Sequence, residues 1–342
     1  MSNAHTVETV PGSLEAAPWF FSVSVEPRDD MIEEGDRFGD VAPDAGIEGY
    51  EPSFVTVDGI RTRYYDVGSG DPLVLVHGGN WGGHWSANDW TATFEYLRDR
   101  FRVLAFDRVG CGMTENPSDP AAFRFDADLE HALGFLDAIG LETVHLAGYS
   151  RGAGLATRMA VERPDAVRTL TLTNSVTLGP PVGDDGYRHR RLFDMEELGL
   201  ERTDPAYVRR RLEQYSYRTD YVTDERVRAA AYMASREKAR RTQHVMNEGG
   251  ALEKWMDSLR KHMSEARRRV RNGVVSVPVH YLYGRNDLTM PSEMAMGAMD
   301  LFSQGNAPIR LTVLDECGHM VFLEYPETFA RRVRDLVTYG DG

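Results

Sequence analysis

The residue best placed to act as a nucleophile is Ser150, which lies in the sequence Gly148-Tyr149-Ser150-Arg151-Gly152. This G-x-S-x-G spacing is typical of a sharp turn from a buried strand into a helix. The glycines are needed because side chains at those positions would clash, and the turn exposes the serine oxygen at the edge of the sheet. The helix N-terminus behind it favours developing negative charge. The motif therefore predicts nucleophilic attack by Ser150; a tight turn with an ordinary N-cap serine is the alternative.

Two late loops hold residues that could complete a catalytic triad with this serine. A serine hydroxyl becomes a good nucleophile only when a base takes its proton and a third group orients that base. Asp287 follows the strand expected at 277–283, and His319 follows the strand expected at 309–314. The chain order Ser, Asp, His is the one found with this kind of turn. We therefore predict His319 as the base and Asp287 as its partner; Asp315 competes but is close to His319 in sequence.

The segment Val76–Asn80 could stabilise an oxyanion. It ends a predicted strand and contains His77-Gly78-Gly79. Small residues at such a place let a backbone N–H group approach a developing alkoxide. We assign the two donors to the backbone N–H groups of Gly79 and of Arg151, the residue after the nucleophile. A plain glycine-rich loop is the alternative.

The elements that must position these residues are alternating strands and helices. Asp58-Gly59, between the segments 54–57 and 60–65, predicts the tight turn of a β-hairpin. Apolar runs follow, typical of strands buried on both faces of a parallel sheet. They are residues 72–76, 102–106, 143–147, 168–173, 277–283 and 309–314. A helix with apolar positions at Leu129, Leu133, Leu136 and Ile139 ends at Gly140. The sequence predicts an α/β fold with a mostly parallel central sheet covered by helices.

The pattern of elements divides the chain into four parts. Residues 53–175 and 274–342 carry the strands and form the two halves of a core domain. Residues 176–273 are helical and Arg-rich, and because sheet flanks them we interpret them as a lid; a separate helical domain is the alternative. The helices expected there are 205–217, 224–247 and 251–271. Residues 1–52 form an N-terminal extension, which is either an arm packed on the body through the apolar patch Pro18–Val23 or a disordered tail.

Charge and composition limit the partners of the chain. It has 342 residues, of which 42% are hydrophobic, and a formal charge of −14. A negative field repels phosphates, which argues against a nucleic-acid or anionic-membrane surface. The start of the chain lacks a basic region with an apolar run after it, and no stretch is apolar enough to span a bilayer, so we expect a cytoplasmic protein. Cys111 and Cys317 are far apart in sequence, and no disulfide framework is expected.

Neither a cofactor nor a metal is implied by the motifs. No cluster of His, Cys and Asp has metal-ligand spacing, and the G-x-G-x-x-G pattern is missing after the strand ends. The expected partner is a small-molecule substrate that is largely apolar. Formation of a homo-oligomer is left open.

Five motifs in a fixed order carry a resemblance to a known superfamily. They are His77-Gly78-Gly79, Asp107–Gly112, Gly148–Gly152, Gly284–Asp287 and Cys317-Gly318-His319. Over about residues 54–339 the chain resembles the α/β-hydrolase superfamily, which implies the fold, the triad and the lid described above. A serine rather than an aspartate at the turn distinguishes it from the haloalkane dehalogenase and epoxide hydrolase branches.

Within the superfamily the chain is most similar to the carbon–carbon hydrolases that act on meta-cleavage products, and to related esterases. Trp85-Ser86, the two late loops and Val222–Arg226 carry this resemblance. The chain departs from that branch at positions that bind the acidic dienone there. These departures are Tyr149 before the nucleophile, Ala87 after the Trp-Ser pair (with Asn88 one position later), Ala230 in the lid and Met320 after the histidine.

Three functions are consistent with these motifs. Hydrolysis of a small-molecule ester or lactone through an acyl-enzyme comes first, because the triad is intact while the dienoate-binding residues are not. Hydrolysis of a carbon–carbon bond in a meta-cleavage-type dienone comes second, and a non-catalytic ligand receptor on the same fold comes third. The residues expected to line the substrate pocket are Asn80, Trp81, Trp85, Tyr149 and Met320, with core packing as the alternative for the tryptophans. Arg151 and Arg285 could meet an anionic substrate or form structural ion pairs.

Overall fold

The computed structural model describes residues 38, 40–175, 177–178, 200–247, 249–290 and 292–340. The apolar patch expected at 18–23 and residues 179–199 of the expected lid lie outside this part of the chain. Among the described residues, no helix has the length and apolarity needed to cross a bilayer. Nor, within the same residues, does any group of three or more His, Cys, Asp or Glu side chains come together as metal ligands would. Cys111 and Cys317 are both buried and are not bonded to each other.

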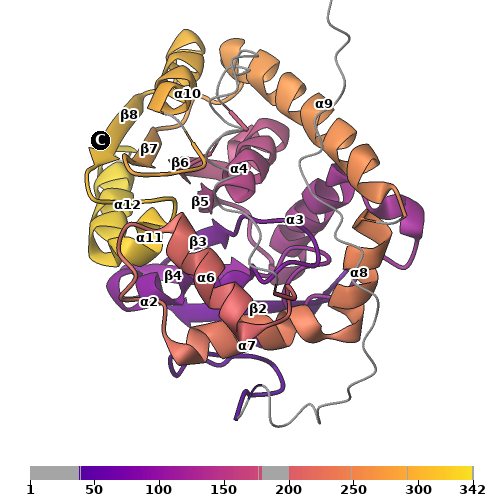
Figure 1. Ribbon diagram of the computed structural model, residues 1–342. Helices are drawn as coiled ribbons and strands as arrows, with labels where there is room; N and C mark the ends of the chain where they lie inside the picture. The colour runs from indigo at the N-terminus through magenta and orange to yellow at the C-terminus, as the bar shows by residue number, and fades with distance from the viewer. Residues whose placement is uncertain are drawn as a thin grey trace, which may run out of the picture. The chain divides into compact units, whose positions relative to one another are not determined.

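A single sheet is formed by the eight strands of the described residues, in the order β1-β2-β4-β3-β5-β6-β7-β8 (Figure 1). The strands are β1 (Ser53–Val57), β2 (Ile60–Gly68), β3 (Asp71–Val76), β4 (Phe101–Phe106), β5 (Val144–Tyr149), β6 (Val167–Thr173), β7 (Val279–Gly284) and β8 (Ile309–Leu314). Strand β2 is antiparallel to β1 and β4, and all other neighbours are parallel. The predicted mostly parallel sheet is therefore confirmed. So is the hairpin turn, where Asp58 and Gly59 have φ angles of +47° and +83°.

Helices cover both faces of the sheet, as the continuous apolar strands require. Residues such as Val74 and Val76 point to one face and pack with helices α3, α4, α9 and α10. Residues such as Leu73 and Leu75 point to the other face and pack with α2, α11 and α12. The bounds of these helices are α2 (Thr91–Leu97), α3 (Phe125–Ile139), α4 (Arg151–Glu162), α9 (Ala251–Arg271), α10 (Ser292–Gln304), α11 (Val321–Glu324) and α12 (Pro326–Gly340). Short 3-10 helices connect them at η1 (Ala87–Trp90), η2 (Pro120–Ala122) and η3 (Pro164–Ala166).

Four described helices lie between β6 and β7, where the sequence predicts the lid. They are α6 (Pro205–Tyr215), α7 (Asp224–Ser235), α8 (Glu237–Asn247) and α9. The single helix expected over 224–247 is wrong, because it is broken at Arg236, whose ψ of 146° is extended rather than helical. Helix α9 buries Trp255 and Met263 in the same core as the sheet. It therefore serves the core domain as well as closing the inserted segment.

Residues 40–50 fasten helix α7 to the core. Ala45 and Ile47 are buried in an apolar cluster with residues of α7. Arg226 of α7 is buried, and its guanidinium donates to the backbone oxygen of Asn88 at 2.7 Å and forms an ion pair with Glu48. An arginine whose two Nη atoms donate to a carboxylate and a carbonyl is held in one place. This contact ties the C-terminal end of the expected extension, the inserted helices and η1 together.

Candidate active site

Ser150 occupies the turn between β5 and α4 that the motif predicts. Its φ and ψ angles are +52° and −123°, a region that L-residues rarely adopt. The turn is held from the neighbouring strand, because the Ser150 N–H donates to the Thr173 oxygen at 3.0 Å. The two motif glycines have no room for a side chain: a Cβ at Gly148 would lie 2.5 Å from the Gly152 oxygen, and one at Gly152 2.2 Å from the Val76 oxygen.

The strain at Ser150 gives a prediction about stability. The free energy of unfolding of Ser150→Gly should be about 1 kcal/mol higher than that of Ser150→Ala. Glycine adopts the positive φ without the steric cost that a Cβ brings. Alanine keeps the Cβ and the strain, so it is the matched control. Chemical denaturation of both variants measures the difference. Equal stabilities would mean that the turn stores no strain.

Asp287 and His319 form the pair that the late loops predict. The Nδ1 atom of His319 lies 2.7 Å from Oδ2 of Asp287, and both side chains are buried. Burial opposes ionisation of Asp287, but the adjacent His319 and the hydrogen bonds that it accepts outweigh burial and lower its pKa. Because an ionised carboxylate only accepts, Nδ1 carries a proton, and the neutral form of the ring therefore has its lone pair on Nε2. This is the tautomer that a general base requires.

The competitor Asp315 lies outside this pair. Its side chain is 70% exposed and lies 3.8 Å from Arg285, which is 68% exposed. The two residues form a surface ion pair of the kind that contributes little to stability. Of the two alternatives for Arg285, the structure therefore supports the ion pair.

Asn174 is a site residue that the sequence did not reveal. Its Nδ2 donates to Oδ2 of Asp287 at 2.6 Å, and its Oδ1 accepts from the Gly284 N–H at 3.1 Å. Thr289 adds two further donors to the other oxygen of Asp287, at 2.7 Å and 2.8 Å. Asn174 directly follows β6 and has a φ of +38°. A polar residue at the carboxyl end of a buried strand is the signal that could have pointed to it.

The segment around Gly78 and Gly79 lies directly against the nucleophile turn. A Cβ at Gly78 would be 2.9 Å from the Cβ of Ser150, and one at Gly79 would be 2.0 Å from Trp85. The carbonyl groups of both glycines accept from Arg108, at 3.2 Å and 2.8 Å. Fixing these carbonyls fixes the orientation of the peptide groups beside Ser150. The assignment of Gly79 and Arg151 as oxyanion donors stays a prediction.

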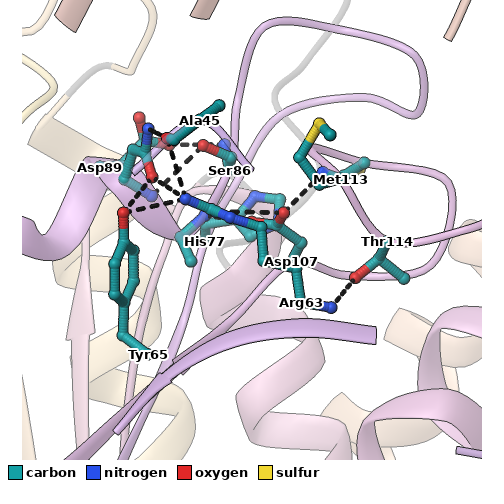
Figure 2. Close-up of polar contacts among 12 residues, drawn as sticks. Ala45, Arg63, Tyr65, His77, Ser86, Asp89, Asp107, Met113 and Thr114 are labelled. Carbon is teal, nitrogen blue, oxygen red and sulfur yellow. Dashed lines mark hydrogen bonds and ion pairs between the residues drawn. The ribbon is translucent and has the colours of Figure 1, made fainter. Parts of the chain in front are cut away.

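A buried polar network supports the segment around Gly78 and Gly79. Figure 2 shows Arg63 reaching Asp107, with Nη1 to Oδ1 at 3.2 Å, and both side chains are closed to solvent. Asp107 also accepts from the N–H groups of Ala87 and Met113, each at 2.7 Å. His77 accepts at Nε2 from the backbone N–H of Arg108 at 3.0 Å. The network links β2, η1 and the loop after β4, so that the Gly78–Gly79 segment rests on a rigid base.

The residues expected to line a pocket divide into two groups. Trp81, Tyr149 and Met320 are buried in the core, and Nε1 of Trp81 donates to Asp128 at 2.8 Å. Asn80 and Trp85 are half-buried. The surroundings of Trp81 fit core packing, the alternative to a pocket role. A pocket role for the other four residues stays a prediction.

Arg151, the residue after the nucleophile, packs its guanidinium on an aromatic ring. Its guanidinium carbon lies 4.9 Å from the centre of the Trp255 ring, a cation–π contact. Burial, with the repulsion of Arg108 added, lowers the pKa of Arg151 to about 10, while Tyr215 and Asp128 act in the opposite direction. The side chain thus stays charged at neutral pH. Arg151 is the next residue after Ser150, and its contact with an anionic substrate stays a prediction.

Comparison with known families gives one match that covers most of the chain. Residues 71–326 match the family described as the alpha/beta hydrolase fold. This range includes strands β3 to β8 and all three candidate triad residues.

Proteins with named activities are similar over more than four fifths of the chain. A 2-hydroxymuconate semialdehyde hydrolase of Pseudomonas sp. strain CF600 is 28% identical over 283 residues, which are 83% of this chain and 92% of that protein. A 2-hydroxy-6-oxo-2,4-heptadienoate hydrolase of Pseudomonas putida is 29% identical over 84% of this chain and 96% of its own. Among solved structures, the 2-hydroxy-6-oxo-6-phenylhexa-2,4-dienoate hydrolase of Rhodococcus sp. strain RHA1 has a TM-score of 0.66 at 21% identity, covering 84% of this chain and 99% of that one. This structural likeness shows a common fold.

Proposed function

The chain belongs to the α/β-hydrolase fold family, and on that basis we propose that it is a serine hydrolase that breaks a carbon–carbon bond in an acidic dienone of the meta-cleavage type. The observation that carries the proposal is the similarity of more than 80% of the chain to two hydrolases named for compounds of this kind. The similarity also spans more than 90% of each relative, so it is not limited to one motif. The buried Asp287–His319 pair supplies the base that the reaction needs.

This proposal reverses the order of the first two functions drawn from the motifs. Judged by single positions, ester or lactone cleavage is the first expectation, because Tyr149, Ala230 and Met320 differ from the dienone-binding pattern. The relatives support the carbon–carbon alternative better, since they resemble the chain along its length. The third function, a non-catalytic receptor, finds no support, because the family and these relatives are hydrolases.

Cleavage of a carbon–carbon bond requires an electron sink for the departing carbon. In a 2-hydroxy-6-oxo-2,4-dienoate, a proton moves from the 2-hydroxyl to carbon 5 and leaves a 2-oxo-3-enoate joined to the ketone. When the bond between carbons 5 and 6 breaks, its electron pair passes through the alkene onto the 2-oxo group. The products are a 2-hydroxydienoate and a carboxylic acid, so no redox partner is needed.

The residues of this chain are assigned to that reaction as follows. His319 takes the proton of Ser150 at Nε2, and the serine oxygen attacks the ketone carbon. The backbone N–H groups of Gly79 and Arg151 stabilise the resulting oxyanion. Breaking of the carbon–carbon bond leaves an acyl-enzyme, and the dienolate oxygen takes the proton from His319. Water, activated by the same histidine, then releases the acid, while Asp287 maintains the tautomer of His319 throughout.

A substrate of this class carries a carboxylate, which needs a cation in the site. The lid position where the family pattern has an arginine is Ala230 here, and it is buried in α7. The nearby Arg226 is bound to Glu48 and to the Asn88 carbonyl. We therefore propose that the carboxylate binds to Arg151, the residue after the nucleophile.

Arg151→Met tests this assignment through a split between substrates. The variant should raise KM for an acidic dienone about 10- to 100-fold, because it removes a charge-assisted contact but keeps the backbone N–H and much of the side-chain volume. KM for a neutral nitrophenyl ester should stay within about twofold. Arg285→Met, at the exposed pair with Asp315, is the matched control and should change neither value. Equal losses on both substrates would contradict the assignment.

We also propose that α6, α7 and α8 act as the lid of the site. The last residue of α6, Tyr215, accepts at its backbone oxygen from the His319 N–H at 2.7 Å. Its ring lies 5.3 Å from that of His319 and 5.4 Å from that of Trp85. A helix end that contacts the catalytic base is well placed to exclude water from it.

The proposed function is tested by comparing substrates on the purified full-length protein. A chromogenic 2-hydroxy-6-oxo-dienoate should be cleaved with a kcat/KM at least about 100-fold above that for p-nitrophenyl acetate. The opposite order would overturn the proposal in favour of ester cleavage, which Tyr149, Ala230 and Met320 suggest.

A further inference from the structure

Tyr149, the residue before the nucleophile, contacts three parts of the site at once. Its ring lies 6.4 Å from the ring of His319. A Cβ on Gly78 would lie 2.7 Å from the Tyr149 ring, so that ring packs directly on the oxyanion segment. The peptide bond joins it to Ser150. Any shift of Tyr149 would therefore change the relative positions of nucleophile, base and oxyanion segment.

One short hydrogen bond holds the polar end of this tyrosine. The Tyr149 hydroxyl donates to Oδ2 of Asp89 at 2.5 Å, and both side chains are buried. Asp89 lies in η1, where the same oxygen accepts from the Ser86 N–H at 3.3 Å. The rest of the tyrosine environment is aromatic, with ring centres of Trp90 at 5.5 Å and Phe322 at 4.5 Å. Packing fixes the ring plane, and the hydrogen bond fixes how far the ring extends towards η1.

We propose that Asp89 and Tyr149 form a positioning pair that holds the nucleophile turn against the oxyanion segment, and that the pair works best when Asp89 is ionised. A carboxylate acceptor makes a shorter and stronger hydrogen bond to a phenol than a neutral carboxyl group does. Protonation of Asp89 therefore loosens the anchor without removing it. The inference rests on the proposed role of Ser150 as nucleophile but is independent of the substrate.

The surroundings of Asp89 allow its charge to change near neutral pH. Burial raises the pKa of Asp89 to about 7, against the hydrogen bond from Tyr149, the charge of Arg226 on α7 and the Ser86 N–H, which lower it. Asp107, at the end of β4, raises it further. Tyr221, from the loop before α7, also interacts electrostatically with Asp89. Burial raises the pKa of Tyr221 far above neutrality, so this tyrosine stays uncharged. Since the pKa of an acid is raised, Asp89 is neutral below about pH 7 and charged above it.

The test uses a probe that reacts with an activated serine and needs no known substrate. A fluorophosphonate forms a bond between Ser150 Oγ and phosphorus, fluoride leaves, and the serine proton goes to His319. The ratio of the wild-type rate constant to that of Asp89→Asn should be near one at about pH 5.5 and rise to about five- to tenfold above pH 8. Taking the ratio cancels the pH dependence of every other group that both proteins share.

Tyr149→Phe keeps the ring and removes only the hydroxyl. It should react at pH 8 about as slowly as Asp89→Asn, and the double variant should be no slower than either, because both changes break one interaction. Tyr65→Phe is the matched control, since its hydroxyl is also buried and donates to Asn88 of η1 at 2.7 Å. Its rate ratio to wild type should be independent of pH.

Two results would overturn the positioning pair alone. They are a wild-type to Asp89→Asn ratio that is constant from about pH 5.5 to 8.5, and losses that add in the double variant. If Asp89→Asn does not fold by circular dichroism, Tyr149→Phe carries the same test, because its ratio to wild type should also rise through pH 7. A wild-type protein that is not labelled at Ser150 would instead contradict the proposed function, and with it this inference.

Discussion

Replacing Ser150 by alanine is expected to lower kcat on the dienone by about 10⁴- to 10⁶-fold, because no other group can form the acyl-enzyme. The backbone should not change, since alanine keeps the Cβ at the same positive φ and the turn is held by the Thr173 oxygen. Substrate affinity should therefore persist while turnover is lost. Single-turnover absorbance and a binding titration measure the two quantities separately.

The matched control for this variant is another serine of the core domain. Ser258→Ala on α9 removes a hydroxyl that donates to Asp126 of α3, and neither helix contains a residue of the triad. It should retain kcat within about twofold. A Ser150→Ala protein with more than about one tenth of the wild-type rate would show that the nucleophile lies elsewhere.

Asp287→Asn should lower kcat by about 10⁴-fold with little change in KM, because it disturbs the tautomer of His319. The oxygen that faces His319 also accepts from Asn174 at 2.6 Å, and the other oxygen accepts twice from Thr289. If the asparagine amide nitrogen faces His319, it meets the donor of Asn174, and if it takes the other position, it meets the two donors of Thr289. With the amide nitrogen facing His319, the amide would donate to Nδ1 and the ring proton of His319 would move to Nε2. A general base needs the lone pair on Nε2.

Asp315→Asn separates this effect from a general loss of acidic charge. Asp315 is the competing aspartate of the sequence, and its exposed side chain pairs with Arg285, whereas His319 pairs with Asp287. Its kcat should remain within about twofold of wild type. Steady-state kinetics of both variants decide the assignment: a large loss in Asp315→Asn with a small loss in Asp287→Asn would reverse it.

Local patterns were sufficient to predict the sheet and the position of the nucleophile. Gly148 and Gly152 have no room for a side chain, and this steric requirement lies within five residues of sequence. The turn at Ser150 can therefore be predicted from the sequence alone. His319 and Asp287 could be placed because parallel strands bring their carboxyl ends to one edge. The break at Arg236 was missed, since residues on both sides favour a helix and only the extended backbone of Arg236 separates α7 from α8.

Contacts between distant segments could not be predicted in the same way. Asn174 meets Asp287 across 113 residues, and Arg226 meets Glu48 across 178. Asp89 and Tyr149 are 60 residues apart, and neither is unusual in its local sequence. Such pairs depend on where the loops settle once the sheet has formed. For the same reason Tyr149 looked like a departure from a substrate-binding pattern, whereas the structure places its hydroxyl on Asp89.

The most direct test of the central claim is to identify the products formed from a 2-hydroxy-6-oxo-dienoate by mass spectrometry, in water enriched in oxygen-18. The proposed mechanism predicts two acids from one dienone, with the label in the acid derived from the ketone, and neither product with Ser150→Ala. An unchanged dienone, in a protein that hydrolyses nitrophenyl esters in a Ser150-dependent manner, would contradict carbon–carbon cleavage and assign the chain to the esterases.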